Sequence, residues 1–241
     1  MNEPAPPADE RVPYGAHPSQ FVDFRYPAGR PRALAINIHG GFWRERFDLT
    51  HAGHPCAALT AAGYLTANIE YRRVGEDGGG WPGTIEDVRC AVRSVRARNP
   101  DLAAVLLGHS AGGHLALCMA AEMADLRGVV AFGAVCNPCR AFHLNLGSGA
   151  AAEFFGGSPT QFPDRYAMAA PVCPTLLIHG TNDEVVPVEM AREFEGGRLI
   201  EIAGADHFDP IDPETAAFQE TLTAIERLCR PPSQTPPSAP R

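Results

Sequence analysis

Short apolar runs recur along the chain, separated by segments in which apolar residues are spaced differently. Runs of five to eight mostly apolar residues predict strands, most of them buried on both faces. They cover residues 33–38, 64–71, 103–107, 128–135, 175–180 and 198–202. Residues 21–26 largely alternate apolar and polar side chains, which is typical of a strand with one solvent-facing side near a sheet edge.

Between these runs, apolar residues recur at helical spacing. In residues 81–98, Ile85, Val88, Val92 and Val95 form one apolar stripe, and the charged side chains lie off it. Further helices are predicted over residues 55–62, 115–123, 188–195 and 213–229. Because strands alternate with helices, we expect an α/β fold with a mostly parallel, twisted sheet, helices on both faces and right-handed crossovers.

The pattern predicts a single domain over residues 19–230. Prolines at 4, 6, 7 and 13 predict a mobile N-terminal arm without regular structure over residues 1–18. The Pro- and Ser-rich residues 231–241 predict a disordered tail. Residues 137–170 interrupt the alternation, and we expect them to be irregular. This aromatic-rich insertion is compatible with a cap over a pocket and with an ordinary packed excursion, and the sequence does not separate the two.

Composition excludes several classes of function. The chain has 241 residues and a formal net charge of −8, and its 20 basic residues are all arginine without a conspicuous cluster, which disfavours nucleic-acid binding. Neither a signal-peptide pattern nor an apolar run of about 20 residues is present, so we expect no membrane association. Seven scattered cysteines favour free thiols and a cytoplasmic location. Monomer and homodimer both remain open.

The strongest chemical signal is Gly108-His109-Ser110-Ala111-Gly112, a Gly-x-Ser-x-Gly sequence between a predicted strand and a predicted helix. In that context the motif is typical of a nucleophile elbow, in which glycines allow a serine to occupy a strained turn. The N–H of Ala111 begins the helix and favours a developing negative charge. Taken alone, the motif is also compatible with a simple Gly-rich turn.

Other polar residues follow other predicted strands. The sequence 39–43 follows residues 33–38, Asp183 follows residues 175–180, and His207 follows residues 198–202. Ligands of parallel sheets bind at the carboxyl ends of the strands, so we expect these residues to meet Ser110 there. The order Ser110, Asp183, His207 is that of α/β-hydrolases, with the roles of nucleophile, orienting acid and general base.

Several neighbours could be mistaken for these residues: Glu184, Asp206 and Asp209 for the acid, and His39, His109 and His114 for the base. Asp183 is preferred because it follows its strand after a short loop. His109 lies in the elbow itself and His114 inside a helix, so we expect both to serve packing or to line the pocket.

At these residues the chain resembles a known family. His39-Gly40-Gly41-Phe42-Trp43 is similar to the His-Gly-Gly-x-Trp motif of α/β-hydrolases of the esterase type, among them kynurenine formamidase (arylformamidase) and the hormone-sensitive-lipase-like esterases. The resemblance extends from about Tyr14 to Cys229 and includes Glu70-Tyr71-Arg72, Trp81-Pro82 and Asp87. Asp206-His207-Phe208-Asp209 looks closer to the arylformamidases. Phe42 stands where the lipase-like branch usually has a third glycine, which also favours the formamidase-like group.

The resemblance implies an oxyanion hole formed by the backbone N–H groups of Gly41, Phe42 and Ala111. It also implies a substrate-binding site that includes Gly40, Trp43 and His109. The implied reaction is hydrolysis of a small carboxylic ester or an aryl-formamide through an acyl-enzyme on Ser110, without a metal or an organic cofactor. N-formylkynurenine is the specific formamide alternative. A ligand-binding homologue without catalysis is disfavoured because all three residues of the triad are present.

Two further motifs carry weaker alternatives. Asp48, His51 and His54 could form a metal site, but a glycine and a proline interrupt the helix that would present them. The Cys-x-x-Cys sequence over residues 136–139 could mean redox chemistry, but it follows a strand in a layout unlike that of thioredoxin. We therefore expect neither a metal site nor a redox site.

Overall fold

The computed structural model describes residues 4–229, and its centre is one eight-stranded sheet in the order β1-β2-β4-β3-β5-β6-β7-β8. The strands are β1 (Glu10–Pro13), β2 (Phe21–Arg25), β3 (Leu34–Ile38), β4 (Leu65–Ile69), β5 (Ala104–His109), β6 (Gly128–Phe132), β7 (Thr175–Gly180) and β8 (Arg198–Ile202). Strands β3 to β8 run parallel, β2 is antiparallel to β4, and β1 is antiparallel to β2. The predicted α/β fold with a mostly parallel sheet is confirmed.

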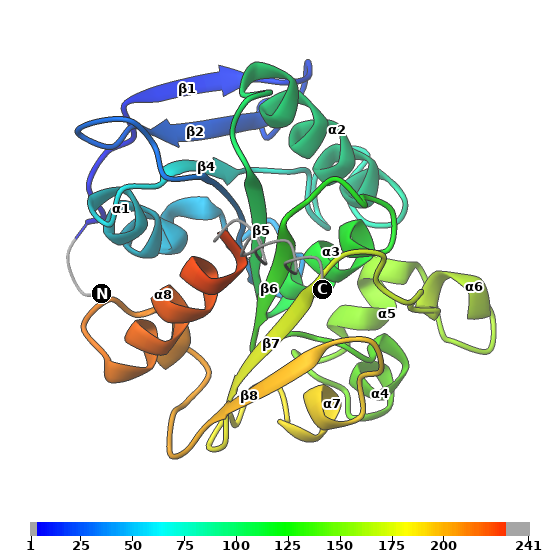
Figure 1. Ribbon diagram of the computed structural model, residues 1–241. Coiled ribbons are helices and arrows are strands. Elements are labelled where there is room, and N and C mark those ends of the chain that lie inside the picture. Colours follow the sequence, from blue (N-terminus) through cyan, green and yellow to red (C-terminus); the bar gives the residue numbers. More distant parts are fainter. Residues whose placement is uncertain (1–3, 230–241) are drawn as a thin grey trace, which may run out of the picture.

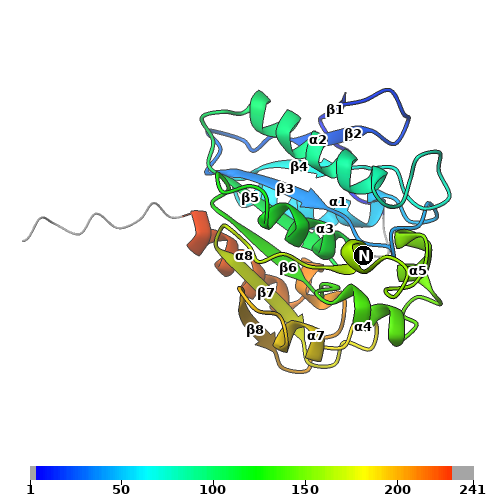
Figure 2. The ribbon, with the colours of Figure 1, turned by 90° about the vertical axis from the view of Figure 1, so that its right-hand side faces the viewer.

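Helices cover both faces of the sheet (Figures 1 and 2). α2 (Gly83–Arg98) and α3 (Ala111–Ala120) pack on one face, with Val88 and Leu115 in the core beneath them. α1 (Gly53–Ala61), entered through the 3₁₀ helix η1 (Leu49–Ala52), and α8 (Ala216–Cys229) pack on the other face. α7 (Glu189–Arg192) and the 3₁₀ helix η2 (Asp209–Ile211) complete the connections at β7 and β8. The apolar stripe predicted for α2 is the side of the helix that is buried.

Part of the N-terminal segment has regular structure, so the prediction of an irregular arm through residue 18 is wrong. Residues 10–13 form β1, which pairs with β2, and Arg11 forms two hydrogen bonds with Asp23, at 2.6 and 2.8 Å. Pro13 is tolerated because β1 is an edge strand, where a missing N–H removes no ladder bond on the solvent side. Residues 1–3 and the tail predicted to be disordered, residues 231–241, lie outside the described part of the chain.

The insertion over residues 137–170 is not irregular throughout. It contains three short helices, α4 (Pro138–His143), α5 (Ala150–Phe155) and α6 (Pro163–Tyr166), which lie together at one side of the molecule (Figure 1). Phe154 and Phe155 of α5 are buried in the core, where Phe154 stacks on Trp43. Arg44 donates hydrogen bonds to the carbonyl oxygens of Gly147 and Ser148, at 2.6 and 3.1 Å. The insertion is therefore anchored in the core and tied to the loop that follows β3.

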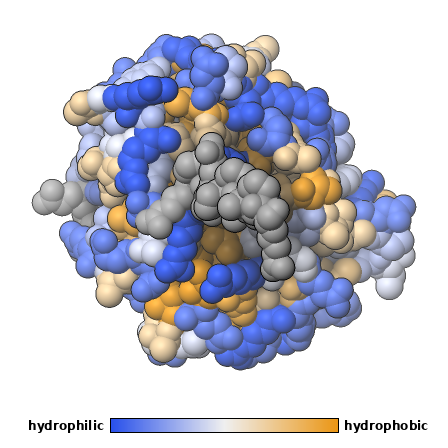
Figure 3. All heavy atoms as spheres, viewed as in Figure 1, coloured by the Kyte–Doolittle hydropathy of each residue, from blue (hydrophilic) through white to orange (hydrophobic). Residues whose placement is uncertain are grey.

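Polar residues cover most of the face shown in Figure 3, with apolar residues in small patches between them. Among residues 4–229, no helix combines the length and the apolar character needed to cross a bilayer.

Candidate active site

Ser110 occupies a strained turn between β5 and α3. Its backbone angles are φ 56° and ψ −117°, in the left-handed half of conformational space that a serine rarely adopts. A Cβ atom on Gly108 would lie 2.3 Å from the carbonyl oxygen of Gly112, and one on Gly112 would lie 2.2 Å from that of Ile38. The glycines of the motif are thus required by close backbone approaches, as expected for a nucleophile elbow.

The structure brings Asp183 and His207 into direct contact. The Nδ1 atom of His207 lies 2.7 Å from Oδ2 of Asp183. The other carboxylate oxygen, Oδ1, accepts hydrogen bonds from the backbone N–H groups of Val185 (2.9 Å) and Val186 (2.8 Å). Burial raises the pKa of Asp183, but hydrogen bonds from His179 and His207 outweigh it and hold that pKa well below the ordinary value. Asp183 is therefore an ionised acceptor in a fixed orientation.

This contact sets the tautomer of His207. Because the ionised carboxylate can only accept, Nδ1 carries the hydrogen, and Nε2 is left with a free lone pair when the ring is neutral. Gly133 follows β6 with φ 47°, and a Cβ atom there would lie 2.9 Å from Nδ1 of His207. Ser110 is next to this position, because its N–H donates to the carbonyl of Phe132 at 2.8 Å.

No hydrogen bond joins the hydroxyl of Ser110 to His207 among residues 4–229. Such contacts are often long before substrate binds and tighten in the complex. The three residues nevertheless follow the carboxyl ends of β5, β7 and β8 at the same edge of the sheet.

Among the described residues, the other candidate acids, Asp206, Asp209 and Glu184, form no hydrogen bond with the imidazole of His207. Oδ1 of Asp206 accepts hydrogen bonds from the N–H groups of Phe208 and Asp209, and the carboxylate of Asp209 accepts one from the N–H of Asp206. These contacts fix the turn that carries His207. Glu184 is exposed. Asp183 is thus the carboxylate that the structure places on the imidazole.

The loop after β3 lies against the elbow. β3 and β5 are neighbours, and a Cβ atom on Gly40 would lie 3.2 Å from Cβ of Ser110. Gly41, Phe42 and Trp43 all have positive φ angles, of 109°, 54° and 58°. Two consecutive left-handed residues other than glycine are costly, so the surrounding contacts must hold this loop in place.

Three backbone N–H groups at this point are free of protein acceptors. Within the described chain, the N–H groups of Gly41, Phe42 and Ala111 donate no hydrogen bond to another residue. Ala111 is also the first residue of α3, where the helix dipole favours negative charge. The structure therefore leaves the donors that the resemblance assigned to an oxyanion hole available for a ligand.

Trp43 and His109, which the resemblance assigned to substrate binding, are both buried. Trp43 is only 2% exposed, and its ring packs against His114 and Phe154 in the core. His109 is 5% exposed, and its Nε2 donates to the carbonyl oxygen of His207 at 3.0 Å, so it supports the loop of His207 from below. Burial lowers the pKa of His109 well below the ordinary value, so its ring is neutral. The sequence could not show that the strand end turns both side chains inward.

A cavity of about 380 Å³ lies next to Phe208, the neighbour of His207. Phe47, His51 and His54 also line it, and Phe47 and Phe208 are both partly exposed. Burial, followed by the charge of nearby His39, lowers the pKa of His51 to about 4, so this part of the wall is uncharged at neutral pH. The cavity offers an aromatic surface beside the site, with Arg46 and Asp48 also in its wall.

The weaker alternatives gain no support. Residues 4–229 contain no group of three or more His, Cys, Asp or Glu side chains placed to hold a metal ion. Burial raises the pKa of the Cys136 thiol to about 12, which opposes the thiolate that redox chemistry needs.

Sequence reasoning gave no role to two buried residues next to the site. Nε2 of His179 lies 3.1 Å from Oδ2 of Asp183 and 2.8 Å from the carbonyl oxygen of Val186. Glu70 contacts His39 at the start of the loop after β3. Both stand at the carboxyl end of a predicted strand, and an ionisable residue in that position was the available signal.

Comparison with known proteins places the chain among proteins similar to esterases. Residues 22–138 match the model of the BD-FAE family. Esterase LipC of Mycobacterium tuberculosis is 27% identical over 84% of this chain, which spans 60% of that protein's length. The chain has the α/β-hydrolase fold, and its sequence is similar to esterases. The uncharacterised protein YfhR of Salmonella typhi is 28% identical to this chain. The match covers 75% of this chain and 67% of YfhR.

Solved structures show the same fold. A truncated carbohydrate esterase from gut microbiota superposes with a TM-score of 0.78 at 21% identity, over 95% of this chain and 98% of that one. Esterase 2 of Thermogutta terrifontis, phosphonylated by sarin, superposes with a TM-score of 0.68 at 21% identity, over 90% and 92% of the two chains.

Proposed function

We propose that this α/β-hydrolase cleaves a small carboxylic ester through an acyl-enzyme on Ser110. The observation that carries the proposal is the hydrogen-bonded pair Asp183–His207 beside a serine in a left-handed elbow, with three free backbone N–H groups around it. A buried carboxylate, an imidazole with a free Nε2 and a strained serine are the parts of a nucleophilic hydrolase.

The steps follow from the orientation of these groups. The hydroxyl oxygen of Ser110 attacks the carbonyl carbon of the substrate while Nε2 of His207 takes its proton. Asp183 stabilises the resulting imidazolium through Nδ1–H, and the N–H groups of Gly41, Phe42 and Ala111 stabilise the oxyanion. His207 then protonates the leaving alcohol or amine. Water, deprotonated by Nε2, attacks the acyl-enzyme and releases the acid and Ser110.

An aryl-formamide such as N-formylkynurenine is the second candidate substrate. It is supported by Phe42 at the position of the third glycine and by the aromatic wall that Phe47 and Phe208 form beside His207. Small carboxylic esters are supported by the matched relatives, among which are esterases and a carbohydrate esterase.

A single comparison tests the proposal. The values of kcat/KM are measured on p-nitrophenyl acetate, p-nitrophenyl butyrate and N-formyl-L-kynurenine, with Ser110→Ala as the blank. Ester turnover that Ser110→Ala abolishes is expected, and a formamide preference of about a hundredfold, or 2.7 kcal/mol, would select the second candidate instead. Folded wild-type protein that neither turns over these compounds nor reacts with a fluorophosphonate probe would mean a ligand-binding homologue.

We further infer a cytoplasmic location and a small-molecule partner, without nucleic acid or membrane, for a monomer or homodimer. The location is supported by the seven cysteines, all of which are free. The partner class is supported by the net charge of −8 and by the size of the cavity next to Phe208.

A further inference from the structure

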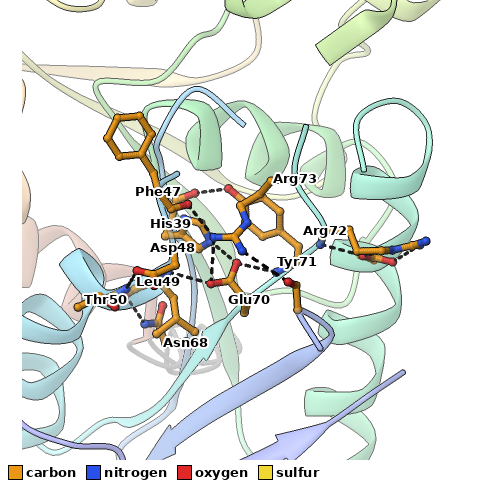
Figure 4. A network of polar contacts seen from close by, with 12 residues as sticks. His39, Phe47, Asp48, Leu49, Thr50, Asn68, Glu70, Tyr71, Arg72 and Arg73 are labelled. Atoms are coloured by element: carbon orange, nitrogen blue, oxygen red, sulfur yellow. Dashed lines mark hydrogen bonds and ion pairs between the residues drawn. The ribbon is translucent and has the colours of Figure 1, made fainter. Parts of the chain in front are cut away.

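Glu70 is a buried carboxylate directly beneath the loop after β3 (Figure 4). It is 2% exposed and receives three short contacts: Nε2 of His39 at 2.8 Å, and the backbone N–H groups of Leu49 and Tyr71 at 2.9 and 3.0 Å. Nη1 of Arg73 lies 3.5 Å from its second oxygen. Every group around this carboxylate is a donor, so both of its oxygens act as acceptors.

The ring of His39 faces an acceptor on each side. Its Nε2 meets Oε1 of Glu70, and its Nδ1 lies 2.8 Å from the carbonyl oxygen of Gly40. A carbonyl and an ionised carboxylate can only accept, so both contacts are hydrogen bonds only if both ring nitrogens carry a hydrogen. The ring is also stacked on Tyr71, with centroids 4.4 Å apart, and the hydroxyl of Tyr71 donates to the carbonyl of His39. The position of the ring is thus fixed on three sides.

The Gly40 carbonyl belongs to the same peptide group as the N–H of Gly41. That peptide is trans, so its C=O and N–H point in opposite directions. Holding the carbonyl toward His39 therefore turns the N–H of Gly41 away from His39. Gly41 has a φ of 109° and could otherwise rotate this peptide readily.

We propose that His39 is a positioning residue that carries a hydrogen on each ring nitrogen. Its Nε2–H is held by Glu70, and its Nδ1–H holds the carbonyl of Gly40. The N–H of Gly41 therefore stays aimed into the oxyanion hole. This inference rests on the proposed hydrolase function. In this proposal the buried pair of His39 and Glu70 holds the N–H of Gly41 in place before substrate binds. Oxyanion stabilisation depends on such preorganised donors.

Further charged and titratable groups lie near His39. Burial raises the pKa of Asp48, but hydrogen bonds from Thr50 and the charges of Arg73 and His39 outweigh it, and the pKa lies below the ordinary value. The ring of His51 lies 5.7 Å away edge-on, and its low pKa leaves it neutral. Arg73 is paired with Glu76 as well as Glu70. His39 thus lies between carboxylates and the ring of His51.

Two isosteres of histidine separate the two contacts. His39→Asn places an amide N–H close to the position of Nδ1 and gives up the contact with Glu70. His39→Gln reaches the position of Nε2 and gives up the hold on the Gly40 carbonyl. We expect His39→Gln to lower kcat about 10- to 100-fold, up to the loss of one oxyanion donor, with KM changed less than about threefold. His39→Asn should retain kcat within about fivefold of wild type. Equal losses in the two variants would overturn the positioning role.

The protonation state is tested without activity. In protein labelled with ¹⁵N-histidine, one ring should show hydrogens on both nitrogens at pH 7.5, and its signals should vanish in His39→Asn. Glu70→Gln should convert that ring to one with a bare nitrogen. A bare nitrogen on His39 of the wild type would overturn the proposal, even if the hydrolase function holds. Absence of fluorophosphonate labelling in the wild type would instead overturn the hydrolase function.

Asp87→Asn is the matched control for Glu70→Gln. Asp87 is equally buried and paired with Arg72, at 2.7 and 2.8 Å, but it contacts neither His39 nor Ser110. Both substitutions should lower the midpoint of thermal unfolding. Only Glu70→Gln should lower kcat at constant KM and change the histidine spectrum. A similar loss of kcat in the control would mean that general destabilisation causes the effect.

Discussion

His114 makes the stability of this protein depend on pH in a way that one substitution can isolate. The side chain lies in α3, 1% exposed, between the rings of Trp43, Phe154 and Phe155. Its Nδ1 has no hydrogen-bond partner among the described residues, and Nε2 lies 3.6 Å from Sγ of Cys118. Burial lowers the pKa of His114 to about 3. The folded protein therefore keeps this ring neutral far below the pH at which an exposed histidine is charged.

The sign and size of the effect follow from proton binding. A histidine in the unfolded chain has a pKa of about 6.5, so below that pH the unfolded state binds a proton that the folded state does not. The contribution is absent above pH 6.5 and destabilises progressively as the pH falls toward about 3. The slope is about 1.4 kcal/mol per pH unit, and the loss between pH 8 and pH 5 is about 2 kcal/mol.

The substitution His114→Leu removes this proton while keeping an apolar side chain of similar size. We expect the free energy of unfolding of the variant, relative to wild type, to shift by about 2 kcal/mol in favour of the variant between pH 8 and pH 5. Urea unfolding followed by circular dichroism at constant ionic strength measures this difference. The contributions of all other titrating groups are the same in both proteins and cancel in the difference. Phe155→Leu trims the same cluster without a titrating group, so its cost should be the same at both pH values. A difference between His114→Leu and wild type that does not change with pH would refute the reasoning.

Three further predictions concern the site itself. In Asp183→Asn the backbone donors keep holding Oδ1, so the new amide N–H faces Nδ1 of His207 and favours the tautomer with the hydrogen on Nε2. In the ester assay kcat should fall by about three to four orders of magnitude, with the circular dichroism spectrum unchanged. Gly133→Ala places a Cβ atom 2.9 Å from Nδ1 of His207 and should lower kcat at least about a hundredfold. Gly204→Ala, also at positive φ but with nothing within 4 Å, should cost about 1 kcal/mol of stability and leave kcat intact; similar kcat losses in both would contradict the steric argument. Arg44→Met should make the loop around residue 147 more sensitive to limited proteolysis, and unchanged cleavage would show that the clamp is dispensable.

Local sequence patterns were sufficient to predict the sheet and the proposed triad. Strand and helix periods are local, and parallel strands place their carboxyl ends together, so Ser110, Asp183 and His207 could be brought to one edge without coordinates. β1 was missed because prolines were taken to exclude a strand, although an edge strand tolerates Pro13. The short helices of the insertion were missed because α4, α5 and α6 are too short to show an apolar stripe.

The direction in which side chains point could not be predicted from the sequence, for a different reason. Trp43 follows a motif that suggested substrate contact, but whether its ring faces the site or the core depends on Phe154, more than a hundred residues away. The contacts of Glu70 with His39 and of His179 with Asp183 likewise depend on how strand ends are aligned. Such pairings are tertiary, and no local spacing encodes them.

The clamp formed by Arg44 has a consequence for how new specificities can arise in this scaffold. One guanidinium joins the loop behind the proposed oxyanion hole to the carbonyls of Gly147 and Ser148 and to the carboxylate of Glu153. Replacing residues 137–170 by the corresponding segment of a relative would therefore remove three acceptors at once and release the loop after β3 along with the old insertion. Recombination between relatives should succeed only where the breakpoints carry the arginine and its acceptors together, so substrate range and catalytic competence are inherited as a unit.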